Sequence, residues 1–324
     1  MTSNGQFLSL FLGCCLGAMS AFAQPQTYPF KPIRVIVPAA AGGATDLTAR
    51  LVGQKMAERL GQAVIVENRP GGNETIGVDV VAKSAPDGYT VLISPPAAVV
   101  ILPHLQKLPY SAERDLAPVS LAAITPLILV VHPALSAQTV KELVALARTR
   151  PGYLSYASAG NGGVQHLAAE LLKTTMKIEI VHVPYKGAGP VMQDLVGGQV
   201  HMFFSGMPPA MPHIRSGKLR ALAVTTTSRS AAAPEVPTMV EAGVPGFDIS
   251  NWFAYFVPAA TPSDVIGKLS AEINRALEQQ DVKEKLASVG AEAMGTSPEG
   301  LAKLMRTESA KFADLIRISG AKLD

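Results

Sequence analysis

One pattern constrains the fold of this chain most strongly: a buried strand, a glycine turn and an amphipathic helix in residues 33–61, IRVIVPAAAGGATDLTARLVGQKMAERLG. The strand ends at Pro38, which has no N–H for a sheet ladder. Gly42 and Gly43 allow the backbone to take positive φ and to approach another group closely. Apolar residues then recur every three to four positions as far as Gly61, which is placed to end a helix. The stretch therefore predicts a strand–turn–helix unit of an α/β fold.

The start of this helix determines what the turn can bind. Thr45 and Asp46 are candidates for its N-cap, and Asp46 also has the chemistry of a general base. We favour the capping role, since a first-turn acid suits a helix N-terminus without any substrate. A helix N-terminus behind a glycine turn presents unpaired N–H groups and the positive end of the helix dipole. The unit thus predicts an anion-holding turn and specifies no chemistry.

The same pattern recurs further along the chain. Residues 153–157 (YLSYA) are strand-like, residues 158–163 (SAGNGG) form a small-residue turn, and residues 164–172 follow helical periodicity. Short glycine turns are common in α/β proteins, so neither unit alone indicates a site. Two such units facing each other aim both helix dipoles at one ligand. Their pairing is the observation that predicts binding.

Composition limits the class of protein. The chain has 324 residues, 48% of them hydrophobic and 16% charged, which describes a globular chain long enough for two domains. The formal net charge is only +3 and there is no basic run, so we expect no nucleic-acid partner. Beyond the first residues, no apolar stretch is long enough to cross a membrane.

Residues 1–23 read as a signal peptide with an A-x-A cleavage site that ends at Ala23, so the mature chain begins at Gln24. The first six residues carry no Lys or Arg, which leaves a membrane anchor as the alternative. Cys14 and Cys15 lie inside this segment, so a cleaved chain contains no cysteine and no disulfide. We expect an exported protein of a bacterial periplasm.

Two alternations of strands and helices divide the mature chain, the first in residues 33–94 and the second in residues 127–225. This order predicts mainly parallel sheets with right-handed crossovers. Beyond Pro262 every segment reads as helical and needs an existing sheet to cover, so we expect it to return to the first alternation. The predicted division is lobe 1 from residues 24–123 and 251–324 and lobe 2 from residues 124–250, with crossings near Ala122–Pro126 and Phe247–Trp252.

Catalytic and metal-binding motifs are absent from the sequence. There is no phosphate-binding loop, no G-x-S-x-G elbow and no H-E-x-x-H. His166 and Glu170 share a helix face, but two ligands do not make a metal site, so we favour a surface or capping role for them. Arg69 and Lys186 stand beside glycines and are either anion contacts or solvated loop charges, with the second role favoured. For Trp252 we favour packing at the second crossing over stacking on a ligand.

Longer strings carry a resemblance to a known family. They are KPIRVIVPAAAGGATDLTARLVGQKMAERLGQAVIVENRPGGN, APDGYT, KLPY, SYASAGNGGVQHLAAELL, VPYKGAGPVMQDLVGGQV, HIRSGKLRALAVT and VPTMVEAGVPGF. In order and over essentially the whole mature chain, they resemble the tripartite tricarboxylate transporter substrate-binding family, also called the Bordetella uptake gene family. The resemblance implies a periplasmic binding protein of the type II-like fold: two α/β lobes closing on a ligand in the cleft.

The resemblance also implies a function. A small carboxylate is gripped by the two turns, partly through ordered water, and is delivered to integral membrane permease subunits. It implies no catalytic residue, no metal and no cofactor, and we expect a monomer. The implied ligand-binding residues are Ala41, Gly42, Gly43, Thr45, Asp46, Ser94, Ser158, Ala159, Gly160, Asn161, Gly162 and Ser205.

Several positions depart from the family pattern. Ala39 and Ala41 replace the Phe and Pro that usually precede the glycines of the first turn. Residues 95–100 (PPAAVV) stand where polar residues are usual. His201 replaces an acid, and Ser205 stands where Asn or Asp is common. Together they favour a more apolar and roomier pocket and argue against an amino-acid or citrate ligand.

Two other functions compete with transport. A sensor subunit would present the same ligand-bound surface to a membrane receptor, and neighbouring permease genes would separate the two. A periplasmic α/β enzyme is disfavoured because neither turn shows a nucleophile beside a base.

Overall fold

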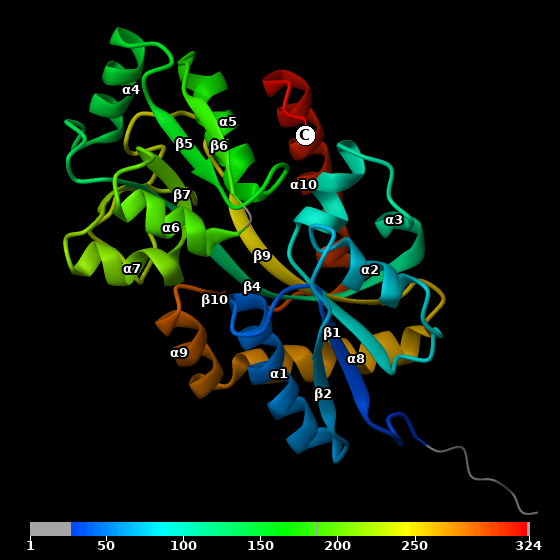
Figure 1. The fold of residues 1–324 in the computed structure, drawn as a ribbon. Coiled ribbons are helices and arrows are strands. Elements are labelled where there is room, and N and C mark those ends of the chain that lie inside the picture. The colour runs from blue at the N-terminus through cyan, green and yellow to red at the C-terminus, as the bar shows by residue number, and fades with distance from the viewer. Residues whose placement is uncertain (1–26, 186, 323–324) are drawn as a thin grey trace, which may run out of the picture.

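A computed structural model describes residues 27–185 and 187–322, so the predicted signal peptide and Lys186 lie outside the described residues. Helices and strands alternate along most of the chain (Figure 1). Within the described part, no helix is both long and apolar enough to cross a membrane. The elements are β1 (Ile33–Val37), α1 (Ala44–Leu60), β2 (Val64–Asn68), α2 (Thr75–Ala82), β3 (Thr90–Ser94), the π-helix η1 (Ala97–Ile101), the 3₁₀ helix η2 (Leu102–His104), α3 (Ala112–Asp115), β4 (Leu116–Val131), α4 (Val140–Thr149), β5 (Ser155–Ser158), α5 (Val164–Met176), β6 (Val181–Pro184), α6 (Ala188–Val196), β7 (Met202–Gly206), α7 (Met207–Arg215), β8 (Arg220–Val224), β9 (Ser250–Pro258), α8 (Ser263–Glu278), α9 (Gln280–Ser288), β10 (Glu292–Ala293) and α10 (Pro298–Ser319).

One ten-stranded sheet has the order β2-β1-β3-β9-β4-β7-β5-β6, with β8 and β10 also paired to β4. β1 is parallel to β2 and β3, and β5 is parallel to β6 and β7, as the alternating pattern predicts. β9 and β4 separate these two parallel groups by antiparallel pairing. We call the group around β1 and its helices lobe 1, and the group around β5 and its helices lobe 2. The observed architecture is the two-lobed α/β arrangement expected from the sequence.

Both connections between the lobes are strands. β4 pairs with β9 from Leu116 to Pro126, and from Leu127 to Val131 it pairs with β7 and β8. The expectation that a strand begins at Leu127 was therefore wrong. β4 contains Pro118 and Pro126 although proline has no N–H for a ladder, and its pairing with β9 shifts register between Pro118 and Ser120.

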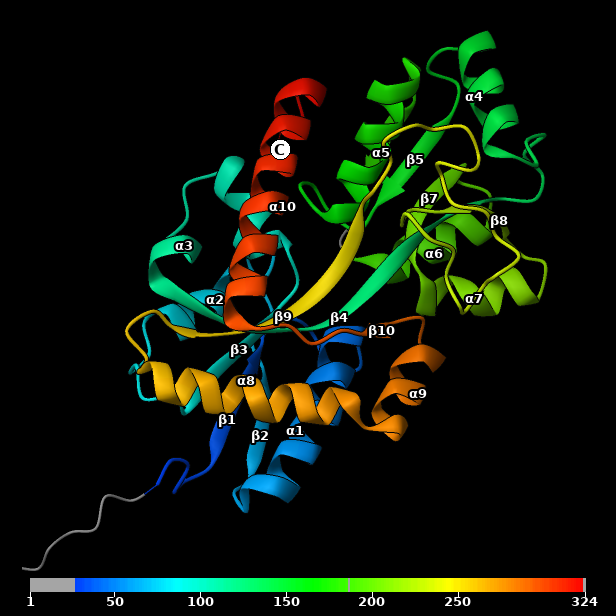
Figure 2. The ribbon, with the colours of Figure 1, turned by 180° about the vertical axis from the view of Figure 1, so that it is seen from behind.

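The C-terminal helices return to the first lobe, as predicted. Figure 2 shows α8 lying against the sheet of lobe 1 and α10 crossing beside β9 and β4 toward α5. Leu269 and Ile273 of α8 share a buried cluster with Ile33 and Val35 of β1. α10 goes further than expected, because its fully buried Phe312 belongs to a cluster that also contains residues of α5. This helix therefore packs against both lobes.

Candidate functional site

The turn between β1 and α1 leaves a helix start without a side-chain cap. α1 begins at Ala44, and its N-cap is Gly43 in an extended conformation with no side-chain hydrogen bond. The expectation that Thr45 or Asp46 caps the helix was wrong, since both lie inside its first turn and are buried. Gly42 has φ 85°, where a side chain is strained. The N–H groups at this end therefore face outward from an exposed, small-residue turn.

Asp46 stabilises this turn through hydrogen bonds. Its Oδ2 accepts the Gly42 N–H at 3.0 Å and the Arg50 Nε–H at 3.0 Å. Burial opposes ionisation of the carboxyl, but the bonds from Arg50 and Gly42 outweigh it and hold the Asp46 pKa below its usual range. A carboxylate engaged in this way is a poor general base. Its contribution to a ligand is indirect: it holds the backbone of the turn in place.

The second turn repeats this geometry. α5 begins at Val164 behind an extended Gly163 that has no side-chain cap. The turn needs glycine at Gly162, where φ is 71°. Ser158 Oγ donates to Gly160 O at 3.1 Å and also bonds His182 Nε2 at 2.7 Å. The predicted ligand-binding hydroxyl of Ser158 is thus engaged by its own turn.

α1 and α5 share a glycine at the N-cap. A missing side-chain cap alone is not special to them, because α2, α8 and α9 also begin without one. Ser111, Thr139 and Ser297 cap α3, α4 and α10. Four helices instead start behind glycines without a side-chain cap. These helix starts are α1 at Gly43, α5 at Gly163, α6 at Gly187 and α7 at Gly206.

All four follow the carboxyl ends of β1, β5, β6 and β7, the edge at which open α/β sheets bind ligands. α7 has prolines in its first turn, which remove N–H donors. α1 in lobe 1 and α5 in lobe 2 are the two predicted anion-holding turns.

The remaining predicted site residues lie at the same edge. Ser94 ends β3 and Ser205 lies near the end of β7, and both are fully buried. Their hydroxyls donate to neighbouring carbonyls, Ser94 to Pro95 O at 3.0 Å and Ser205 to Gly206 O at 2.9 Å. Both serines therefore stabilise the sheet edge through the backbone.

Sequence reasoning missed a contact between the lobes. The Asn73 side chain, in the β2–α2 connection of lobe 1, donates to the Asn161 carbonyl of the second turn at 3.3 Å. Its neighbour Glu74 places a carboxyl against the backbone N–H of Ala98 in η1, and burial raises the Glu74 pKa to about 8. The glycine pair before Asn73 was the available signal, since it marks a backbone that bends sharply.

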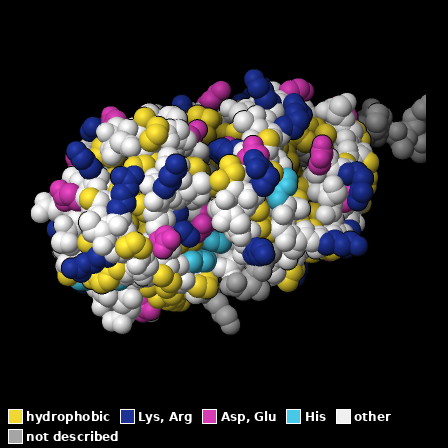
Figure 3. Space-filling view, turned by 90° about the horizontal axis from the view of Figure 1, so that it is seen from above, with side chains coloured by type: hydrophobic (Ala, Val, Ile, Leu, Met, Phe, Trp, Pro, Cys, Tyr) yellow, Lys and Arg dark blue, Asp and Glu magenta, His cyan; other side chains and the backbone are white. Residues whose placement is uncertain are grey.

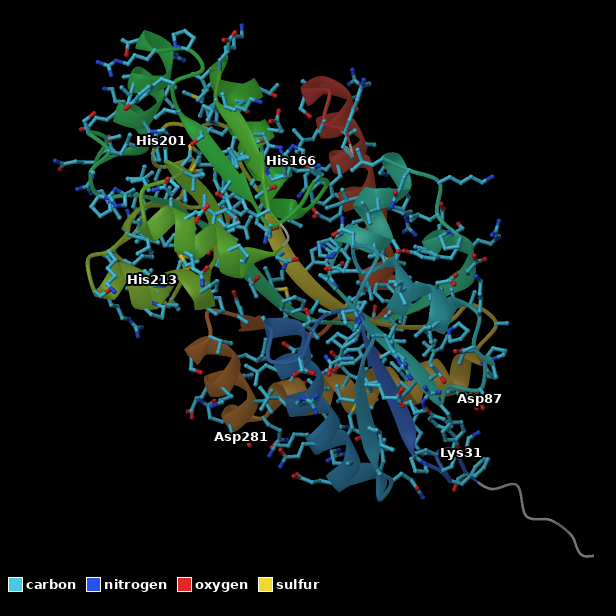
Figure 4. The ribbon with its side chains drawn as sticks, in the orientation of Figure 1. Lys31, Asp87, His166, His201, His213 and Asp281 are labelled. Carbon is cyan, nitrogen blue, oxygen red and sulfur yellow. The ribbon has the colours of Figure 1, made fainter. Side chains whose placement is uncertain are left out.

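Other residues singled out in the sequence are engaged within the protein. His201 precedes β7, so it lies at the amino end of the strand, where its Nδ1 accepts the Ser155 N–H at 3.0 Å. Figure 4 places it on the far side of lobe 2, so its assignment to the pocket was wrong. Arg69 is about half exposed and pairs with Glu67 at 3.3 Å. Trp252 is 1% exposed and packed in the core, as favoured.

The distribution of charged side chains and of candidate metal ligands indicates no second site in the described residues. Lys and Arg side chains lie among Asp and Glu over the face seen in Figure 3. Within the part of the chain that the structure describes, no group of three or more His, Cys, Asp or Glu side chains is arranged to hold a metal ion. The candidate site is therefore built from backbone donors, glycines and small side chains.

Comparison with known proteins fits this geometry. The family described as "Tripartite tricarboxylate transporter family receptor" matches residues 48–321. The chain belongs to this family. Among receptors of this kind, BugT of Bordetella pertussis is 40% identical over 307 residues, 94% of each chain.

Solved structures agree with the family assignment. An R. palustris protein solved with adipate superposes with TM-score 0.84 at 33% identity, over 92% of this chain and all of that one. MatC from Rhodopseudomonas palustris with bound malate gives TM-score 0.79 at 34% identity, over 89% of this chain and all of that one. The two-lobed fold of a periplasmic binding protein is thereby confirmed for this receptor.

Proposed function

We propose that this receptor is a periplasmic solute-binding protein that captures a small carboxylate in the cleft between its lobes and delivers it to a tripartite tricarboxylate-type permease. One observation carries the proposal. The two lobes each contribute a helix, α1 and α5, that begins behind an uncapped glycine at the carboxyl edge of its sheet. The adipate and malate in the related structures make dicarboxylates the first ligands to test.

The carboxylate is held mainly by backbone N–H groups. A charge-assisted hydrogen bond contributes about 1.5–3 kcal/mol, and a helix N-terminus adds about 0.3–1 kcal/mol. Bonds from two helix starts therefore offset the cost of desolvating and ordering the ligand. We assign the direct contacts to Gly43 and Asn161. Gly42 and Gly162 shape the two turns, because their N–H groups are held by Asp46 and His166, and Asp46 and Ser158 have a supporting role. Ala41, Thr45, Ala159 and Gly160 complete the walls of the two turns, with Ser94 and Ser205 behind them.

The rest of the proposal concerns the whole chain. Lobe 1 comprises residues 24–123 and 251–324, and lobe 2 comprises residues 124–250. The protein acts as a monomer that turns over no substrate, and residues 1–23 direct its export. Family membership supports the periplasmic location and the carboxylate ligand.

A single glycine tests the binding mechanism. A Cβ at Gly43 meets nothing nearer than Ala40 O at 3.7 Å, so Gly43→Val leaves the fold intact while its side chain blocks access to the helix start. Calorimetric titration with adipate and malate should show binding by the natural chain and at least a tenfold loss in the variant. Gly267→Val is the matched control, because Gly267 has open space around it in α8, away from the cleft.

The same samples test for catalysis. Adipate or malate incubated overnight with the protein should be recovered unchanged. Conversion at an enzymatic rate, or full affinity in Gly43→Val, contradicts the proposal.

A further inference from the structure

Three aromatic rings lie stacked beneath the second turn. His166 of α5 and His182 of β6 have ring centroids 4.2 Å apart with planes inclined by 8°. Tyr156 of β5 stacks on His182 at 4.7 Å and lies 6.2 Å from His166. His166 is 5% exposed and Tyr156 is fully buried. Figure 4 places His166 on the side of lobe 2 that is turned toward the rest of the molecule.

The hydrogen bonds of this stack define the proton positions. Gly162 N donates to His166 Nδ1 at 3.1 Å, which requires a lone pair on Nδ1 and therefore a neutral ring protonated on Nε2. Because the Ser158 hydroxyl proton goes to Gly160 O, its oxygen accepts from His182 Nε2. His182 thus holds the start of the turn and His166 holds its end.

Among the described residues, two charged side chains of α5 beside the stack are paired with each other. Glu170 Oε1 accepts the Tyr156 hydroxyl at 2.6 Å and the Lys173 ammonium at 2.6 Å. Burial, together with the bond to Glu170, raises the Tyr156 pKa, so the phenol stays a donor. The charged groups of α5 that face the stack, Glu170 and Lys173, therefore compensate one another. The Gly162 N–H is bonded to His166 and to neither of them.

We infer that His166 is a positioning residue for ligand binding, whose Nδ1 holds the Gly162 N–H and thereby sets the direction of the N–H groups at the start of α5. This inference rests on the proposed function, because the direction of those groups matters only if they bind a ligand. Without the acceptor, the Gly162 N–H is free to turn and the φ of 71° loses its restraint. Protonation of Nδ1 has the same effect as removing the acceptor.

Two substitutions separate the acceptor from the ring. His166→Phe keeps a flat ring in the stack and removes the acceptor, whereas His166→Asn removes the ring and keeps an acceptor oxygen on the same helix face. Amide hydrogen exchange of the ligand-free protein reports on the turn directly. Exchange at Gly162 should be about tenfold faster in His166→Phe and close to natural in His166→Asn.

His201→Phe is the matched control. His201 Nδ1 accepts a backbone N–H, that of Ser155, at 3.0 Å at the opposite end of β5. This variant should speed exchange at Ser155 and leave Gly162 unchanged.

Adipate titration of the same variants connects the turn to binding. His166→Phe should weaken binding about tenfold, with His166→Asn restoring most of the affinity and His201→Phe leaving it natural. Unchanged exchange at Gly162 in His166→Phe, or no rescue by His166→Asn, overturns the inference. If the natural protein binds no dicarboxylate, the proposed ligand class is wrong, and hydrogen exchange alone then decides whether His166 positions the turn.

Discussion

At the scale of single residues, Glu74 occupies an unusual position. It is the last of a run with positive φ, in which Gly71, Gly72, Asn73 and Glu74 have φ of 121°, 57°, 54° and 77°. A non-glycine residue in this region costs of order 1–3 kcal/mol, so the surroundings must hold it there. The Glu74 carboxyl accepts the Ala98 N–H, and its Oε2 is buried with no partner among the described residues. Buried in this way, the carboxyl is protonated at pH 7.

This protonation makes stability depend on pH. Below its ordinary pKa of 4.5, Glu74 carries a proton in both the folded and the unfolded state. As the pH rises from 4.5 to about 8, only the folded state keeps the proton, so the free energy of unfolding falls by up to about 1.4 kcal/mol per pH unit. Glu74→Gln should remove this slope in urea denaturation measured from pH 5 to pH 8.

Glu67→Gln is the control for that measurement. Arg34 lowers the Glu67 pKa to about 2, so Glu67 stays ionised throughout the range. The control should keep the natural slope. An equally steep slope in Glu74→Gln would show that another group titrates.

At the scale of elements, the capped start of α4 differs from the uncapped start of α1. Thr139 caps α4 by accepting the Glu142 N–H at 3.2 Å, whereas α1 begins behind Gly43 without a cap. A cap typically stabilises a helix by about 1 kcal/mol. Under the proposed function, the missing cap leaves the N–H groups of α1 to the ligand at the cost of the stability that a cap would add.

Gly43→Asp should therefore change stability and binding in opposite directions. The new carboxylate accepts the free N–H groups and interacts favourably with the helix dipole, raising the free energy of unfolding by about 0.3–1 kcal/mol. It also occupies the anion position and repels a carboxylate, so adipate affinity should fall at least tenfold. Thr139→Ala, measured beside it, should lower stability by about 1 kcal/mol with affinity unchanged. A Gly43→Asp variant that binds adipate normally would rule out α1 as a contact.

At the scale of the whole molecule, two paired strands and one helix join the lobes. The β4–β9 ladder shifts register between Pro118 and Ser120 and again between Leu121 and Ala123. Such irregularities bend a strand and increase its local twist. α10 packs against β4 of this ladder and against α5 of lobe 2. A ligand that contacts both turns binds the closed arrangement better and so shifts the molecule toward it.

Closure should be visible in solution. Small-angle scattering should give a smaller radius of gyration with saturating adipate than without it.

Asn73→Ala tests the hydrogen bond between the lobes. It removes the bond to the Asn161 carbonyl, which is 3.3 Å long and exposed to solvent and contributes about 0.5–1.5 kcal/mol. Adipate affinity should fall up to tenfold in this variant, mainly through faster dissociation in stopped-flow measurements.

Thr75→Ala tests whether the effect belongs to the bond between lobes. Thr75 lies in the same segment, but its hydroxyl donates within lobe 1, to Gly72 O at 2.7 Å. This variant should bind and close normally. Equal losses in both variants would attribute the effect to the segment and not to its contact with lobe 2.

The sequence determined the features that depend on local order. Periodicity and turn chemistry located α1 and its end at Gly61, where φ is 63°. They also located the second glycine turn and the helices beyond Pro262, but the expectation that this whole segment is helical was wrong, because β10 lies in it and pairs with β4. Each of these follows from residues a few positions apart, whose backbone preferences act within one element.

Only the tertiary structure decided which partners the predicted site residues take. Ser158 was predicted as a ligand contact, but its hydroxyl is engaged by His182, which lies 24 residues away. Asn73 reaches Asn161 across 88 residues, and His201 lies at the end of its strand opposite the cleft. A side chain's partners depend on which strands become neighbours and which edge of the sheet a residue occupies. These are properties of chain pairing over long distances, and local sequence carries no direct signal for them.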